Sequence, residues 1–195
     1  SVYDYPYLSS SANHIFDITV GVGSTSPTYN AVGNGNGVLT QKAKKRNVYN
    51  QLAQVLAGYD KDGKVLDFDQ DGNILAGGTK HKDVFVIPFS RLLVKDEIKK
   101  GSFTMALGVG QTFANPFANS ISITDASGSD GYFVNSPAGE YGILFAKDRT
   151  STPISTSRST TAAVSGVPVG LLYYQAGIAV ITASVFTGPA NGAPA

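Results

Sequence analysis

Apolar and polar residues alternate along several short segments of the chain, a pattern typical of β-strands with one buried face. Other segments are continuous apolar runs, as in strands buried on both faces. The strands predicted in this way cover residues 15–20, 84–89, 102–109 and 120–124, together with a hairpin over 169–186 that turns at Gln175-Ala176-Gly177. The pattern predicts a mainly β fold, an antiparallel β-sandwich or barrel-like domain.

One stretch, about residues 41–57, has the periodicity of an amphipathic α-helix. Its apolar face is expected to contain Val48, Leu52, Val55 and Leu56. Thr40 is a candidate N-cap, and Gly58 can end the helix in the left-handed conformation. A second, shorter helix over 91–101 is also compatible with the sequence, with Gly101 at its end.

The remaining segments are expected to be extensions. Residues 1–13 are rich in Tyr and Ser and predict an N-terminal arm, and residues 187–195 predict a tail or linker. Between them, 14–186 is expected to form the β-rich domain. The Ser/Thr-rich stretch 147–166 is long enough to be mobile, or to be ordered only by a neighbouring molecule.

The formal net charge of the 195-residue chain is only +1, so no overall field attracts nucleic acid or a membrane surface. Cysteine is absent, which excludes disulfides and thiolate chemistry and fits assembly in a reducing cytoplasm. The basic residues Lys42, Lys44, Lys45 and Arg46 cluster in the predicted helix. Without interleaved aromatic residues they indicate a solvated helix face more than a nucleic-acid or acidic-partner site.

The stretch "YDKDGKVLDFDQDGNIL" is the densest group of candidate ligands in the chain. Asp67, Asp69, Asp71 and Asn73 match the first half of an EF-hand-type calcium loop. The twelfth position of that loop is Gly78, where calcium loops carry a bidentate Glu. These four residues are therefore possible calcium ligands, and no other cofactor is expected.

A second interpretation of the same stretch needs no metal. Asp62-Gly63 and Asp71-Gly72 are each suited to a tight turn, because Gly and Asp tolerate positive φ. Two turns around a short strand, with the aspartates pointing outward, account for more of the residues, and we favour this interpretation.

No catalytic signature is present. The two histidines, His14 and His81, are not accompanied by a G-x-S-x-G nucleophile motif, and the chain has no P-loop and no H-E-x-x-H. The G-x-G spacing after residue 20 is followed by Pro27 instead of a helix start, which argues against a dinucleotide site. The chain is not expected to be an enzyme.

Several long segments resemble virion structural proteins of tailed bacteriophages, in particular T4-like myoviruses of marine cyanobacteria. The segments are "YDYPYLSSSANHIFDITVGVG", "KKRNVYNQLAQVLAGYD", "FSRLLVKDEIKKGSFTMALGVG", "SITDASG", "YFVNSPAGEYGILFA" and "VGLLYYQAGIAVITASVF". They run from residue 3 to about 186 and contain no catalytic motif. The resemblance implies a structural component of a phage particle, assembled in the host cytoplasm.

The expected function is therefore protein–protein contact in a symmetric virion assembly, in the tail, neck or baseplate in preference to the head. Its partners would be copies of itself and other virion proteins, with no direct nucleic acid and no membrane. The arms 1–13 and 147–166 are the expected inter-subunit contacts. The alternative is a calcium-dependent β-sandwich binding module, for example for carbohydrate.

Overall fold

The computed structural model describes residues 1–3, 13–26, 39–73, 77–108, 112, 114–118, 120–147 and 167–186. The predicted arms and the tail therefore lie mostly outside the described residues, and 148–166 lies wholly outside them. No helix among the described residues has the length and apolar character needed to cross a bilayer.

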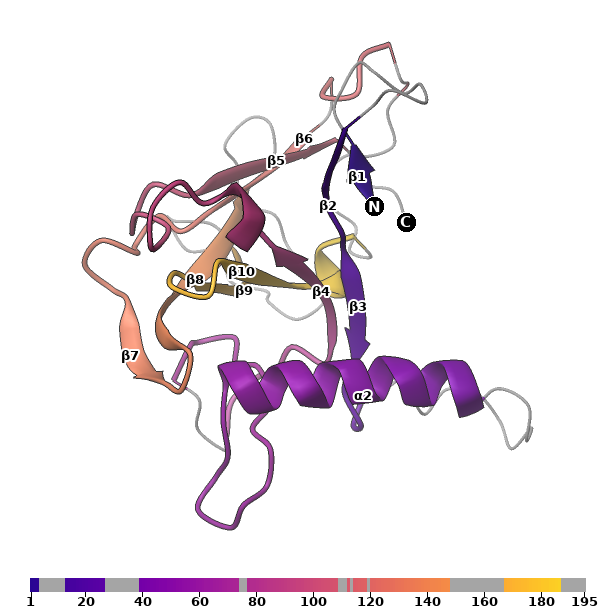
Figure 1. Cartoon of the computed structure of the whole chain (residues 1–195), viewed down its shortest axis with the longest axis vertical. Helices are drawn as coiled ribbons and strands as arrows, with labels where there is room; N and C mark the ends of the chain where they lie inside the picture. The colour runs from indigo at the N-terminus through magenta and orange to yellow at the C-terminus, as the bar shows by residue number, and fades with distance from the viewer. Residues whose placement is uncertain are drawn as a thin grey trace.

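One curled antiparallel sheet of eight strands dominates the fold and forms a half-barrel (Figure 1). The strands lie in the order β3-β4-β10-β9-β8-β6-β5, and β7 pairs with β8. Their bounds are β3 Thr19–Val22, β4 Asp83–Pro88, β5 Thr104–Gly108, β6 Ser120–Thr124, β7 Phe133–Ser136, β8 Gly139–Lys147, β9 Val167–Tyr173 and β10 Ile178–Thr182. A separate two-stranded sheet joins β1 (Val2–Tyr3) to β2 (His14–Phe16). The prediction of a mainly β, barrel-like fold is confirmed.

Both faces of the central strands are buried, each in its own hydrophobic core. On one face Leu172, Ala179 and Ile181 join residues of β4, β6 and β8 inside the curl of the sheet. On the other face, Leu171, Tyr173 and Val180 pack against helix α2 (Leu39–Leu56) and the segment after it. The side chains of β9 and β10 therefore alternate between two apolar environments, which explains why this region of the sequence is apolar almost throughout.

The strand predictions differ from the structure mainly at their ends. The predicted strand 15–20 is divided between β2 and β3, which belong to different sheets. The hairpin predicted over 169–186 ends at Thr182, and Ala183–Phe186 forms the 3-10 turn η2. Strand β7 was not predicted, because its residues "FVNS" carry no alternating pattern.

The face that helix α2 turns to the sheet is only partly the predicted one, since Leu56 is buried and Leu52 is partly buried against the same core, as expected. Tyr49, Ala53 and Leu56 are its buried residues, whereas Val55 is 64% exposed. The cause is a close approach to β3, where a Cβ at Gly21 would lie 3.2 Å from the Cα of Tyr49. The helix also begins at Leu39, so Thr40 lies in its first turn and is not the cap. Gly58 ends it with φ +88°, as predicted.

The second predicted helix, over 91–101, is wrong. Only the 3-10 turn η1 (Ser90–Leu92) forms, followed by bends. Three of the four apolar residues of this stretch, Leu92, Leu93 and Val94, are contiguous and do not form one helical stripe, and Val94 is 98% exposed. Ile98 alone packs on the core, and its N–H donates to the carbonyl of Tyr174 (3.1 Å).

A buried carboxylate, that of Asp125, ties the end of β6 to this stretch. Asp125 accepts hydrogen bonds from the backbone N–H of Gly101 (2.7 Å) and Phe103 (2.8 Å) and from the hydroxyl of Tyr174 (3.1 Å). Burial, with the nearby Asp125 carboxylate, raises the pKa of the Tyr174 hydroxyl. These three donors satisfy the hydrogen-bonding capacity of the Asp125 carboxylate, whose burial without them would be destabilising.

We expect Asp125→Ala to lower the free energy of unfolding by about 2 kcal/mol, because it leaves three donors without their acceptor. The matched control is Asp130→Ala in the exposed turn that follows, which is expected to change it by less than about 0.5 kcal/mol. Urea unfolding of both variants measures the difference, and equal losses would contradict the role given to Asp125.

Candidate functional site

The aspartate-rich stretch lies between helix α2 and strand β4, and it begins with a tight hairpin. Tyr59 and Val65 form a bridge, and the N–H of Asp60 donates to the carbonyl of Lys64 (2.8 Å). Gly63 has φ +77°, and the Asp60 carboxylate accepts the N–H of Asp62 (2.9 Å). The first predicted Asp-Gly turn is therefore confirmed.

The second Asp-Gly pair opens a wider loop. Gly72 has φ +73°, and the chain returns so that Asp69 bridges to Lys80. Single bridges at Tyr59 and Asp69 stand in place of the predicted short strand in the described part of this segment.

The expectation that the aspartates point outward is wrong for Asp69. Its side chain is completely buried, and the ammonium of Lys80, itself 12% exposed, forms an ion pair with Oδ2 of Asp69. The ion pair explains the burial, because a buried carboxylate needs a cation or several donors. By contrast, Asp71 and the Asp62 side chain are exposed.

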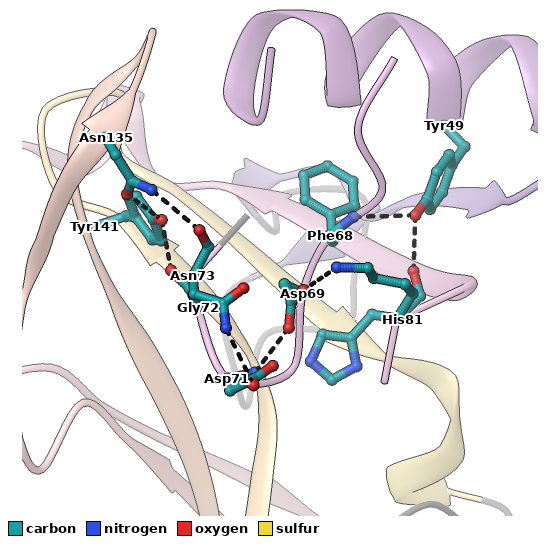
Figure 2. Close-up of polar contacts among 10 residues, drawn as sticks. Tyr49, Phe68, Asp69, Asp71, Gly72, Asn73, His81, Asn135 and Tyr141 are labelled. Carbon is teal, nitrogen blue, oxygen red and sulfur yellow. Dashed lines mark hydrogen bonds and ion pairs between the residues drawn. The ribbon is translucent and has the colours of Figure 1, made fainter. Parts of the chain in front are cut away.

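The bridge between Asp69 and Lys80 is held against helix α2 by Tyr49 (Figure 2). The hydroxyl of Tyr49 donates to the carbonyl of His81 (2.9 Å) and accepts the N–H of Phe68 (3.2 Å). The rings of Tyr49 and Phe68 meet edge to face at 5.3 Å. One buried side chain of the helix thus fixes both sides of the bridge.

On the side of the sheet, polar contacts link the loop to β7 and β8 (Figure 2). The hydroxyl of Tyr141 lies 2.6 Å from the carbonyl of Gly72 and 2.6 Å from Oδ1 of Asn135. Asn135 donates to the carbonyl of Asn73 (3.1 Å), whose own amide donates to Asp71 (3.2 Å). These contacts fix the loop at Gly72 and Asn73, and they connect it to the core through Tyr141.

Asp69 and Asp71 differ in pKa although they are close neighbours. Burial raises the pKa of Asp69, a hydrogen bond with Asp71 raises it further, and the ion pair with Lys80 opposes both effects. The same hydrogen bond lowers the pKa of Asp71. Asp69 is therefore the carboxyl of the pair that holds a proton more readily, and Asp71 is the one that stays ionised.

Only part of the predicted calcium site comes together. Asp69 and Asp71 are adjacent, but Lys80 already neutralises Asp69, and the amide nitrogen of Asn73 faces Asp71. In the described part of the chain, no three His, Cys, Asp or Glu residues are grouped closely enough to hold a metal. Calcium binding by Asp67, Asp69, Asp71 and Asn73 stays a prediction, and it would require Lys80 to leave Asp69.

No protein-family model matches the chain, and neither does any curated protein or solved structure in the comparisons.

The site consists of Lys80, the buried carboxyl of Asp69 and the exposed carboxyl of Asp71, and Asp69 contacts both of the others. Lys80 was not among the predicted site residues, because it lies eleven residues from Asp69 and its relation to the aspartates depends on the loop between them. Such a triad can stabilise the loop electrostatically, transfer protons, or join its amine to a carboxyl. It does not resemble a pair of acids held across a cleft, as in glycosidases.

We expect Lys80→Ala to lower the free energy of unfolding by about 3 kcal/mol, because it leaves the Asp69 carboxylate buried without its cation. The matched control is Lys61→Ala, which breaks the exposed pair with Asp62 at a cost of less than about 0.5 kcal/mol. Thermal and urea unfolding check both values. A loss at Lys80 no greater than at Lys61 would contradict the buried ion pair.

Proposed function

We propose that this chain is a structural component of a tailed-phage virion that acts through protein–protein contacts in a symmetric assembly. We assign it to the tail, neck or baseplate in preference to the head. The observation that carries the proposal is the open side of the half-barrel, where two edge strands flank an apolar cavity. The segments quoted above resemble phage virion proteins, and this resemblance indicates the kind of assembly.

The two edges are β3 and β5. In the described part of the sheet, β3 pairs only with β4, and β5 pairs only with β6, so each leaves one row of backbone N–H and C=O groups without a strand partner. Proteins that act alone usually protect such edges, because an extended segment of another chain can pair with them. In an assembly, a segment of a neighbouring chain can pair with such an edge, and the edge then becomes part of an interface.

Between the two ends of the curled sheet lies an apolar cavity of about 290 Å³. Its lining comes from the segment before β3 and from β4, β5 and β10, namely Ile18, Phe85, Ile87, Leu107, Gly108 and Ile181. Ile18 is 42% exposed and Val20 is 37% exposed. Apolar side chains beside a free edge offer pockets for the alternate side chains of an added strand.

The occupant we propose is an extended segment of a neighbouring copy of the chain. The sequence offers two candidates, residues 1–13 and 147–166, whose composition suits segments that are ordered on contact. Both stay predictions, since most of the first and nearly all of the second lie outside the described residues.

The proposed role is structural and not enzymatic. The site described above contains one buried acid paired to a lysine, a combination that contributes to a stable loop without any substrate. The calcium-dependent binding module has no observation in its favour beyond the four candidate ligands.

The proposal is tested with gold-labelled antibody against this chain on intact phage particles purified from a lysate that contains it. We expect label at one place on the tail, neck or baseplate. Detergent-opened particles serve as the control for buried epitopes, and an antibody against a known head protein serves as the positional control.

Label absent from both intact and opened particles, with the chain free in the lysate, would contradict the virion role. The binding-module alternative would then take its place. Label on the head would keep the virion role and overturn only the assignment to the tail, neck or baseplate.

A further inference from the structure

The backbone holds Asp69 and Lys80 side by side on one face of an antiparallel bridge. The flanking hydrogen bonds run from Gln70 N–H to the carbonyl of Thr79 (2.9 Å) and from His81 N–H to the carbonyl of Phe68 (2.8 Å). Asp69 and Lys80 are thus a non-hydrogen-bonded pair, the kind in which opposite side chains come closest, with Cα atoms about 4.5 Å apart. Their contact is built into the fold.

Burial of the Asp69 carboxyl favours its protonated form. The Asp69 side chain is completely buried, and Lys80 donates directly to its Oδ2. Two charges removed from water gain less from each other than they lose in hydration unless many hydrogen bonds surround them. Transfer of one proton from the ammonium to the carboxylate gives an amine in contact with a carboxylic acid. These are the two reactants of amide formation.

We propose that Lys80 and Asp69 condense into an intramolecular amide bond that closes a covalent ring over residues 69–80. The nitrogen of Lys80 attacks Cγ of Asp69, the Nζ–Cγ bond forms, and one C–O bond of the carboxyl breaks. Of the three ammonium protons, one stays on the amide and two leave with the oxygen as water. The reaction needs no oxidant, reductant or other reagent.

Asp71 is placed to carry the protons. The Asp69 carboxyl, when it holds a proton, can donate a hydrogen bond to the Asp71 carboxylate. The backbone N–H of Asp71 donates to Oδ1 of Asp69 (3.1 Å). The Asp71 carboxylate can take a proton from the attacking nitrogen and return it to the departing oxygen, while the N–H stabilises negative charge on the oxygen that remains. Because Asp71 is exposed, the water released has a path to solvent.

Gly78 leaves room for this arrangement. A Cβ at this position would lie 3.2 Å from Oδ1 of Asp71 and 3.6 Å from Oδ1 of Asp69, and the residue has φ +78°. Two reactive groups fixed at contact distance reach effective concentrations far above any attainable in solution, which is how a condensation becomes feasible within a folded protein without a separate enzyme.

The test is mass spectrometry of the purified full chain, incubated at neutral pH until its mass is constant. We expect an intact mass lower by one water. Trypsin should fail to cut after the acylated Lys80, so the peptide that starts at Val65 should continue to Lys82. Fragmentation of that peptide should give no ions from breaks between Asp69 and Lys80, because the ring holds the pieces together.

Loss of water has one competing source, a succinimide at one of the three Asp-Gly pairs of the chain, Asp62-Gly63, Asp71-Gly72 and Asp130-Gly131. A succinimide leaves Lys80 open to trypsin and is cleaved by hydroxylamine, whereas the amide resists both. The matched variant is Lys80→Arg, which keeps the charge without the primary amine and should retain the full mass. Asp71→Ala should slow the loss of water by at least tenfold, as expected for removal of a proton-transfer group.

A wild-type chain of unreduced mass that trypsin cuts after Lys80 would overturn the proposal. So would a loss of water that persists in Lys80→Arg. The wild-type peptide map decides the question even if a variant fails to fold. It does so independently of the immunogold result, since the ring forms within one chain.

Discussion

The hairpin of β9 and β10 has to be buried on both faces, and the rest of the structure is arranged to meet that requirement. Side chains such as Leu171 and Leu172 point to opposite sides of the sheet, and each joins a separate core. Helix α2 covers one side, whereas the sheet covers the other by curling over itself. A half-barrel with one external helix is the simplest way in which a chain with a single described long helix can cover both faces.

The curling of the sheet has consequences at two of its margins. Where the sheet does not close, β3 and β5 have no further strand partner in the described part of the chain and lie beside an apolar cavity, and there we propose the contacts with neighbouring copies. Where the helix meets the sheet, the loop after it is fixed by Tyr49, Tyr141 and the pair of Asp69 with Lys80. In our proposal the first margin serves assembly, and the second contributes to the integrity of the subunit.

The sequence predicted the β class, several strands and the end of the helix at Gly58, because alternation and Gly conformations act locally. It predicted Leu52 and Leu56 on the buried face of α2 but not Tyr49, whose burial depends on a hydroxyl contact and on the close approach of the helix to Gly21. Nor did it predict the burial of Asp69. An aspartate in a D-x-D-x-D-G run is typically solvated, and only the return of the chain to Lys80 makes it an interior residue.

We propose that the open edges of the half-barrel are interfaces between copies in the virion. Hydrogen–deuterium exchange, compared between the free chain and intact particles, tests it most directly. We expect backbone amides of β3 and β5 to exchange more slowly in the particle, while those of β9 and β10, already buried on both faces, change little. Equal exchange of β3 and β5 in the free and assembled protein would contradict it.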